Sequence, residues 1–394
     1  MLRKTVFLFF LFGTGFFSFA QNDSCSLRIS LLTCSPGEEL YATFGHTALR
    51  VKENTTGADM VFNYGTFEFS PEFYMQFIRG KLLYYLSVED FRGFLQSYQL
   101  QSRSVIEQVL QLNCAEKTKL FSALQINARE ENRSYRYDFL FDNCSTRPKD
   151  MVVKNAASPV YFKNILPAGR PTFRDLIHTY LDRGGQYWSK FGIDILMGSP
   201  VDKKVTNEQA MFLPDYTLKG FDSAIVAHHP LALPPQPILI MPSPLNKGSL
   251  FRPSVVFSLL LVAVLILYFV KKRWAYTTLR VFDFLFFFIL GLAGIVMLFM
   301  WFGTDHTVCR NNLNLWWALP THLFAAFMVH RSKGWPMHYF RAVLGLTILL
   351  MVSWPFLPQH LNAALLPILL LIIFRCWHLS KKRLNAGKKT IIQK

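Results

Sequence analysis

The sequence predicts an α+β domain outside a membrane, followed by an α-helical domain with five transmembrane spans. The composition changes abruptly near residue 244, from mixed polarity to long apolar runs. The N-terminus has the pattern of an export signal. Basic residues between the apolar runs independently place the N-terminal domain on the outer side of the membrane.

The first 20 residues have the three parts of a cleavable signal. Arg3 and Lys4 supply positive charge, the stretch 6–19 is almost wholly apolar, and Ser18-Phe19-Ala20 is a small-x-small cleavage site. A retained anchor helix is the alternative interpretation. We therefore expect a mature external domain over residues 21–244, which is long enough for one sizeable core.

Residues 21–244 alternate short strands with helices. Residues 156–244 hold several prolines and glycines, which indicate short helices and loops. The proline-rich stretch Leu231–Pro244 predicts a stiff, extended linker to the membrane. Periodicity predicts strands at Leu27–Thr33, Thr43–Lys52, Asp59–Tyr64 and Ser104–Leu112, and helices at Pro71–Arg79, Glu89–Gln99, Ala115–Arg129 and Thr146–Asn155.

The second and third strands are close enough in the sequence to form a hairpin. If its turn centres near residues 55–56, Ala48 lies opposite Asn63, and side chains directly opposite share a face. The two-residue period then places His46 on that face, diagonal to Asn63. A register slip of one residue would separate them.

Five apolar runs follow the linker and predict a membrane domain over residues 245–380. Each approaches the roughly 20 residues that cross a hydrocarbon core of about 30 Å. Lys and Arg concentrate after the first, third and fifth runs, so these loops and the tail 381–394 are expected in the cytoplasm. A buried helical bundle is the alternative. The runs are Ser254–Val270, Val281–Phe302, Leu313–Val329, Ala342–Leu357 and Ala363–Leu379.

The formal charge of +17 does not indicate nucleic-acid binding, because much of it lies in the cytoplasmic flanks that set topology. Of the six cysteines, Cys376 lies in the last span and five are external. An odd number leaves at least one external thiol free or paired with another molecule. The sequence does not decide the pairing among Cys25, Cys34, Cys114 and Cys309, or the oligomeric state.

Cys144 is the candidate nucleophile, because a helix is predicted to start there, with Asp142 or Asn143 as its N-cap. A thiol in the first helical turn is expected to have a lowered pKa. His46 is the candidate base, and Asn63 is the candidate partner for its second ring nitrogen. The alternatives are a buried structural cysteine and Cys34 as a rival nucleophile, although the Pro-Gly turn after Cys34 favours a loop or a disulfide there.

The order of a histidine strand before Asn143-Cys144 resembles the permuted branch of the NlpC/P60 superfamily, which includes lecithin:retinol acyltransferase-like proteins. Four motifs in order are similar to the N-terminal domain of Lnb-type lipoprotein N-acyltransferases of Bacteroidota, and the external stretches 303–307 and 311–314 resemble that family's membrane half. The resemblance therefore covers both halves of the chain. The four motifs are Leu32 to Tyr41, Phe44 to Val51, Asn63 to Phe67, and Tyr135 to Arg147.

This resemblance implies that the external domain has a papain-like, permuted fold and faces the periplasm. It implies that the helical domain lies in the inner membrane of a bacterium. It implies that an acyl chain moves from a phospholipid to Cys144 as a thioester, with His46 as general base, and then to the α-amine of a diacylglyceryl-cysteine lipoprotein. No cofactor, metal or nucleic acid is expected. The candidate substrate-binding residues are Tyr64, Asp142, Arg147, Asp305, His306, Asn312 and Asn314.

Other functions remain open at this stage. A membrane-bound cysteine phospholipase would use the same thioester and release it to water. A peptidoglycan amidopeptidase would need no multi-span membrane half. A non-catalytic module that binds lipoproteins would need neither the thiol nor the imidazole.

Overall fold

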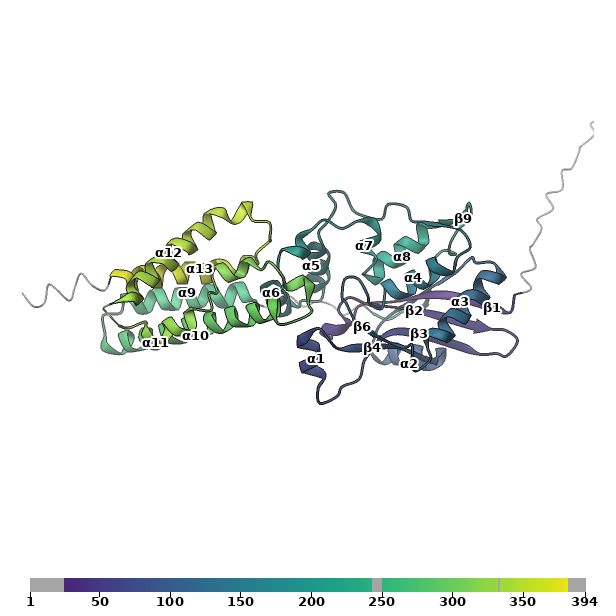
Figure 1. Ribbon diagram of the computed structural model, residues 1–394, viewed down its shortest axis with the longest axis horizontal. Helices are drawn as coiled ribbons and strands as arrows, with labels where there is room; N and C mark the ends of the chain where they lie inside the picture. The colour runs from purple at the N-terminus through teal and green to yellow at the C-terminus, as the bar shows by residue number, and fades with distance from the viewer. Residues whose placement is uncertain (1–24, 243–249, 332–333, 382–394) are drawn as a thin grey trace, which may run out of the picture.

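The computed structural model describes residues 25–242, 250–331 and 334–381. Figure 1 shows two parts along the longest axis: a sheet with its helices, formed by the N-terminal half, and a bundle of helices, formed by the C-terminal half. The expected signal of residues 1–20 and nearly all of the expected cytoplasmic tail lie outside the described residues.

The N-terminal part is built around a seven-stranded sheet with the order β10-β5-β1-β2-β3-β4-β6, in which every neighbouring pair is antiparallel. A second, three-stranded sheet has the order β7-β8-β9. The strands are β1 (Leu27–Cys34), β2 (His46–Glu53), β3 (Asp59–Thr66), β4 (Leu83–Asp90), β5 (Val105–Val109), β6 (Ser134–Arg136), β7 (Val160–Tyr161), β8 (Ile225–Val226), β9 (His229–Pro230) and β10 (Gln236–Leu239).

Helices cover both faces of the large sheet, and side chains alternate between two cores because successive strand residues point to opposite faces. Ile29 and Leu31 pack with α3, α4 and α8, whereas Leu32 and Cys34 pack with Phe94 of α2. The predicted elements up to residue 155 are present with shifted ends, and β4 and β6 are additional. The helices of this part are α1 (Phe73–Arg79), α2 (Phe91–Leu100), α3 (Cys114–Asn127), α4 (Thr146–Asn155), α5 (Phe173–Arg183), α6 (Tyr187–Leu196), α7 (Asn207–Ala210) and α8 (Pro214–Ser223).

The β2–β3 hairpin has the predicted register. Leu49 lies opposite Phe62, so the next position of the same register places Ala48 opposite Asn63. This register places His46 and Asn63 on the α2 face, and the two side chains are hydrogen-bonded. The prediction of this contact is therefore confirmed.

The ends of the N-terminal part are tied to its core. Cys25 and Cys114 form a disulfide that links the chain before β1 to the start of α3. The prediction of an extended linker is wrong for its first half, since Leu231 and Ala232 are buried and the chain then forms β10. Proline is tolerated in β10 because this strand lies at the edge of the sheet.

The C-terminal part is a helical bundle. Three helical segments among the described residues are long and apolar enough to cross a membrane, namely Arg273–Phe302, Trp335–Phe356 and Ala363–Lys381. The first predicted run forms a shorter apolar helix, α9. The helices are α9 (Pro253–Phe269), α10 (Arg273–Phe302), α11 (His322–Met328), α12 (Trp335–Ser353) and α13 (Leu366–Lys381).

The third predicted run, Leu313–Val329, is not one continuous helix. A 3-10 helix at Leu313–Trp316 is followed by α11, and Pro320 lies between them. Proline has no backbone N–H and cannot sit inside a regular helix, so the run is divided there. The count of five spans therefore stays a prediction.

Packing within the bundle depends on small residues and on one buried ion pair. Gly291 and Gly294 of α10 lie against the backbone of the chain around α11, where any Cβ would clash. Asp283 of α10 and Arg375 of α13 are both buried, and the guanidinium binds both carboxylate oxygens, at 2.6 and 2.8 Å. A charge in an apolar bundle requires such a partner.

Candidate active site

Cys144 lies in the turn that leads into α4, two residues before the first helical residue, Thr146. Asn143 Oδ1 accepts hydrogen bonds from the backbone N–H groups of Ser145 at 2.7 Å and Thr146 at 2.9 Å. Such bonds pair N–H groups that the start of a helix leaves without a partner. The Thr146 hydroxyl accepts in return from the Asn143 N–H at 2.8 Å. The predicted N-cap at Asp142 or Asn143 is wrong in position, since Ser145 is the N-cap residue, but the Asn143 side chain pairs the N–H groups at this helix start.

Interior hydrogen bonds fix the cysteine turn against the sheet. Ser145 Oγ lies 3.2 Å from Thr47 Oγ1 of β2 and 2.7 Å from Thr217 Oγ1 of α8. Asn143 Nδ2 donates to two backbone carbonyls, at 2.7 and 2.8 Å. Because a buried polar group that loses its partner is costly, these bonds hold the Cys144 backbone in one position beside β2.

A chain of two hydrogen bonds sets the tautomer of His46. His46 Nε2 lies 2.5 Å from Asn63 Oδ1, and Asn63 Nδ2 donates to Glu89 Oε1 at 3.0 Å. A carboxylate only accepts, so Glu89 orients the Asn63 amide with its oxygen toward the imidazole. Nε2 then carries the proton, and Nδ1 keeps the lone pair that accepts one.

The imidazole and the thiol occupy the same end of the sheet without a hydrogen bond between them in the described part of the chain. The backbone N–H of Thr47, the residue after His46, interacts with the Cys144 sulfur. Both side chains are partly exposed, so a substrate can reach them. Contacts between catalytic groups often tighten only in the complex with substrate.

Gly65 of β3 provides the space for the cysteine. Its φ is +92°, and a Cβ at this position would lie 3.1 Å from the Cβ of Cys144. The β3–β4 pairing is irregular here, between Tyr64 and Thr66. Glycine is thus required both by the backbone conformation and by the close approach of the cysteine.

The His46 imidazole and the Cys144 thiol are both neutral near pH 7. Burial lowers the pKa of His46 to about 4 and raises the pKa of Cys144 to about 11. The backbone N–H groups of Thr47 and of Cys144 itself favour the thiolate, but burial outweighs them. The prediction of a lowered cysteine pKa is therefore wrong for this resting site. A thiol with such a pKa needs a base at the moment of attack.

Arg103 is a buried cation near the site that the sequence analysis did not identify. It is 5% exposed, and its charge favours the thiolate of Cys144. The sheet register explains its position, because Val105 lies opposite Cys34, and Cys34 lies opposite His46. Extending the register argument to β5 would have found this residue.

Glu89 and Cys34 also differ from the sequence interpretation. Glu89 was expected in a helix, but it lies in β4 opposite Val61. Cys34 was expected in a loop or a disulfide, but it is the last residue of β1, free and fully buried. Burial raises the pKa of Cys34 to about 12, so the structure disfavours it as the nucleophile.

The three predicted substrate-binding residues of the N-terminal part contact other protein groups. Tyr64 is buried, and its hydroxyl donates to Asn127 Oδ1 at 2.6 Å. Arg147 Nε and Nη2 donate to the two carboxylate oxygens of Asp142, at 2.6 and 2.8 Å. The same guanidinium lies 3.4 Å from the centroid of Tyr135. The ion pair of Asp142 and Arg147 thus joins the two ends of the cysteine turn, and substrate binding by these three residues stays a prediction.

Asp305 and His306, which follow α10, contact the N-terminal part at the C-terminal end of α1. The Asp305 N–H donates to the Arg79 carbonyl at 3.0 Å, and His306 Nε2 donates to the Phe77 carbonyl at 3.0 Å. Asp305 also lies 3.5 Å from Arg136 across an exposed surface. These two residues therefore connect the membrane part to α1.

Asn312 and Asn314 are buried and do not face an open surface. Asn312 Nδ2 donates to the carbonyl of Ile195 at 2.7 Å, and Asn314 Nδ2 donates to the carbonyl of Asp194 at 3.0 Å. They thus satisfy carbonyls at the C-terminal end of α6, which an isolated helix leaves unpaired. Their predicted substrate contact stays a prediction.

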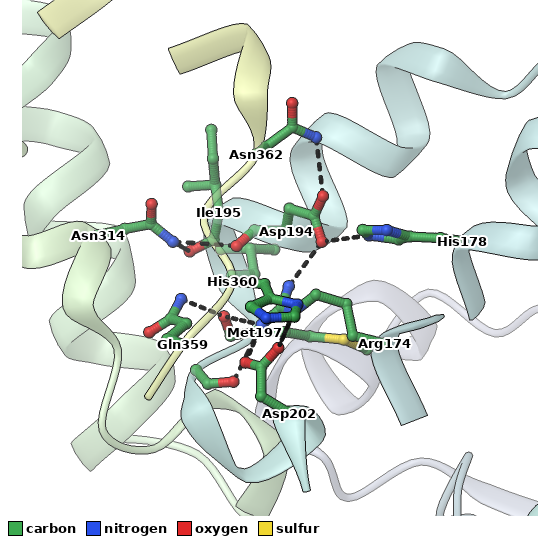
Figure 2. Close-up of polar contacts among 12 residues, drawn as sticks. Arg174, His178, Asp194, Ile195, Met197, Asp202, Asn314, Gln359, His360 and Asn362 are labelled. Carbon is green, nitrogen blue, oxygen red and sulfur yellow. Dashed lines mark hydrogen bonds and ion pairs between the residues drawn. The ribbon is translucent and has the colours of Figure 1, made fainter. Parts of the chain in front are cut away.

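Figure 2 shows the centre of the junction between the two parts. Arg174 of α5 pairs with Asp194 at 2.6 Å and with Asp202 at 2.8 Å. His178 Nε2 and Asn362 Nδ2 reach the Asp194 carboxylate at 2.8 Å each. Burial by itself would raise the pKa of Asp194, but His178 and Arg174 hold this pKa below its ordinary value. Because Asn362 belongs to the membrane part, this carboxylate bridges the two parts of the chain.

The fold and the site define a membrane protein that carries a thiol and an imidazole on an α+β domain. Within the described residues, no three His, Cys, Asp or Glu side chains are grouped to hold a metal ion. Residues 17–179 match the family model of the Lnb N-terminal periplasmic domain, and residues 245–384 match that of the Lnb transmembrane domain. The chain therefore belongs to the Lnb family, with a periplasmic N-terminal domain. Neither the curated proteins nor the solved structures contain a match.

Proposed function

We propose that this protein is a lipoprotein N-acyltransferase. It moves an acyl chain from a phospholipid through Cys144 to the α-amine of a diacylglyceryl-cysteine at a lipoprotein N-terminus. The observation that carries the proposal is the placement of Cys144, at a capped helix start beside a strand whose His46 has a defined tautomer. Fusion to a membrane domain favours lipid substrates over soluble ones.

In the first half-reaction, the Cys144 sulfur attacks the ester carbonyl of the phospholipid while its proton moves to Nδ1 of His46. The carbonyl oxygen becomes an oxyanion, for which the backbone N–H of Cys144 is the candidate donor. The C–O bond then breaks, and His46 returns the proton to the departing lysophospholipid oxygen. The product is a thioester on Cys144.

In the second half-reaction, the lipoprotein amine attacks the thioester carbonyl and gives its proton to His46. The C–S bond breaks, the sulfur takes the proton back, and the amide leaves. One thiol therefore serves two lipid-bearing substrates in turn, as in ping-pong catalysis. The neutral resting pair suits this cycle, since His46 is unprotonated when each nucleophile must lose its proton.

The finer architecture belongs to the same proposal. We place the chain in the inner membrane, with five crossings of the bilayer and a cytoplasmic C-terminus, and assign the periplasmic domain a permuted papain-like fold. The alternation of basic loops supports this orientation. A strand histidine preceding a cysteine at a helix start supports the permuted fold.

Mass spectrometry of the full-length protein tests the reaction. The protein is reconstituted with phospholipid, digested, and examined for an acyl thioester on the Cys144 peptide, and a diacylated lipopeptide is then added. We expect an adduct that is lost with the appearance of a triacylated lipopeptide. Cys144→Ala should abolish the adduct, and Cys309→Ala, at another free buried cysteine, should keep it.

Three outcomes would contradict the proposal in different ways. An adduct that persists in Cys144→Ala would exclude this thiol as the acyl carrier. An adduct that is released only to water would identify a phospholipase instead. No adduct on the wild-type protein, together with tight binding of the lipopeptide, would identify a binding module.

A further inference from the structure

Large apolar side chains gather on the surface of the short helix α1 and the loop before it. Phe69 is 72% exposed and Tyr74 is 69% exposed, although α1 buries only Phe73. Single exposed apolar residues are common, but a contiguous group marks an interaction surface. We call this group the apolar lip; its members are Phe69, Tyr74, Met75, Phe77 and Ile78.

Direct contacts hold the apolar lip at the end of a membrane-spanning helix. α10 ends at Phe302, and the residues that follow it bond to α1 through His306 and the Phe77 carbonyl at 3.0 Å. A Cβ on Gly80, which ends α1, would lie only 3.3 Å from the His306 backbone. In Figure 1, α1 lies on the side of the periplasmic domain that faces the bundle. α1 therefore lies at the level where α10 ends.

A series of ring contacts leads from the apolar lip toward the thiol. Phe77 stacks on Phe73, Phe73 contacts Phe67, and Phe67 contacts Tyr84, with centroid separations of 5.3 to 6.2 Å. Tyr84 in turn stacks on Tyr137 at 4.2 Å. Phe67 also follows by two residues the glycine at position 65 that lies against Cys144. A series of aromatic rings thus connects α1 with the surroundings of Cys144.

We propose that the apolar lip inserts into the periplasmic leaflet of the membrane that α10 crosses, and that a lipid acyl chain passes along these rings to Cys144. The first part rests on the exposed side chains and their contact with the end of α10. The second part also rests on the proposed function. Aromatic side chains are favoured at the headgroup level because one end of the ring is apolar and the other tolerates water.

Fluorescence quenching tests the insertion without any activity. The full-length protein with Cys144→Ala carries a fluorophore on Tyr74→Cys, in nanodiscs whose phospholipids are brominated on the acyl chains. Leu100→Cys is the control, since Leu100 is 83% exposed at the end of α2, and α2 lies farther from the bundle than α1 in Figure 1. We expect strong quenching at position 74 and none at position 100. Equal, weak quenching at both positions would overturn the insertion. The remaining free cysteines, Cys34, Cys309 and Cys376, are buried.

Acylation kinetics test the path to the site. The double variant Tyr74→Asp/Phe77→Asp should slow thioester formation from bilayer phospholipid by about tenfold, because charged side chains are unfavourable in the apolar part of the leaflet. Its reaction with a water-soluble short-chain thioester should be unchanged, and Leu100→Asp should change neither rate. Equal slowing with both donors would overturn the proposal. If the wild-type protein reacts with neither donor, the proposed function fails, and the quenching result still decides the insertion.

Discussion

Gly65 lies directly against Cys144, and a methyl group at position 65 would fit only if the cysteine moved by a few tenths of an ångström. Two residues earlier on the same strand, Asn63 holds the imidazole of His46. β3 therefore contacts both His46 and Cys144, although neither residue belongs to this strand. Alternate positions of one strand share a face, which is why two residues of β3 can serve one site.

Replacing this glycine should displace the cysteine. Gly65→Ala combines a positive φ with a Cβ contact of 3.1 Å, whereas Gly57→Ala has a similar φ of +77° and nothing within 4 Å. Each should lower the free energy of unfolding by about 1–3 kcal/mol, the cost of a strained backbone position. Only Gly65→Ala should also slow alkylation of Cys144 by iodoacetamide. Equal alkylation rates in the two variants would show that the contact does not matter.

The Glu89–Asn63–His46 chain should control the histidine tautomer. Asn63→Leu removes the acceptor for Nε2–H, and thioester formation should fall about 100-fold or more, the usual contribution of a positioned general base. Asn63→Asp keeps an acceptor for Nε2–H but loses the donor to Glu89, so it should retain more activity than Asn63→Leu and less than the wild type. Nitrogen NMR of the imidazole should show protonated Nε2 in the wild type and a mixture in Asn63→Leu. A wild-type spectrum with protonated Nδ1 would refute this assignment.

The pH dependence should reflect two neutral groups at rest. The pKa of Cys144 is raised to about 11, so the thiolate fraction, and with it the alkylation rate, should keep rising with pH through 9 and 10. The pKa of His46 is lowered to about 4, so loss of the base should slow acyl transfer only as pH falls toward 4. Stopped-flow rates of alkylation and of acylation, each measured as a function of pH, test the two expectations. An alkylation plateau already present at pH 6 would reveal a preformed thiolate–imidazolium pair instead.

The buried Asp194 carboxylate should couple the periplasmic and membrane parts. Asn362→Ala removes its 2.8 Å hydrogen bond, and loss of a bond to a buried charge should cost about 1–3 kcal/mol of unfolding free energy. Asp305→Asn, at a half-exposed contact between the same parts, should cost much less. Thermal unfolding in nanodiscs measures both variants. Similar losses would mean that the junction in Figure 2 is not the main link.

Local sequence patterns were sufficient to predict several features of the fold and of the candidate site. The hairpin register follows from a short turn, so the contact between His46 and Asn63 was predictable from the sequence. The hydrogen bonds that Asn143 accepts at the start of α4 are equally local, since their donors are two and three residues away. The bias of basic residues between apolar runs is also a property of the linear sequence.

Long-range packing decided the rest. Arg103, Cys34 and His46 meet only because β5 and β2 both pair with β1. The cysteine pKa was predicted with the wrong sign, because the helix start is visible in the sequence and the depth of burial is not. Asn312 and Asn314 were expected at a substrate surface, but their partners lie more than a hundred residues away in α6.

The sequence by itself determined the family, the order of most strands and helices, and the hairpin that brings Asn63 to His46. These depend on composition, periodicity and neighbours a few residues apart. Only the tertiary structure decided the neutral state of the thiol, the Cys25–Cys114 disulfide, the junction at Asp194 and the position of the apolar lip beside the membrane. The physical reason is that desolvation and docking depend on which distant segments exclude water from one another, and the spacing of residues along the chain does not contain that information.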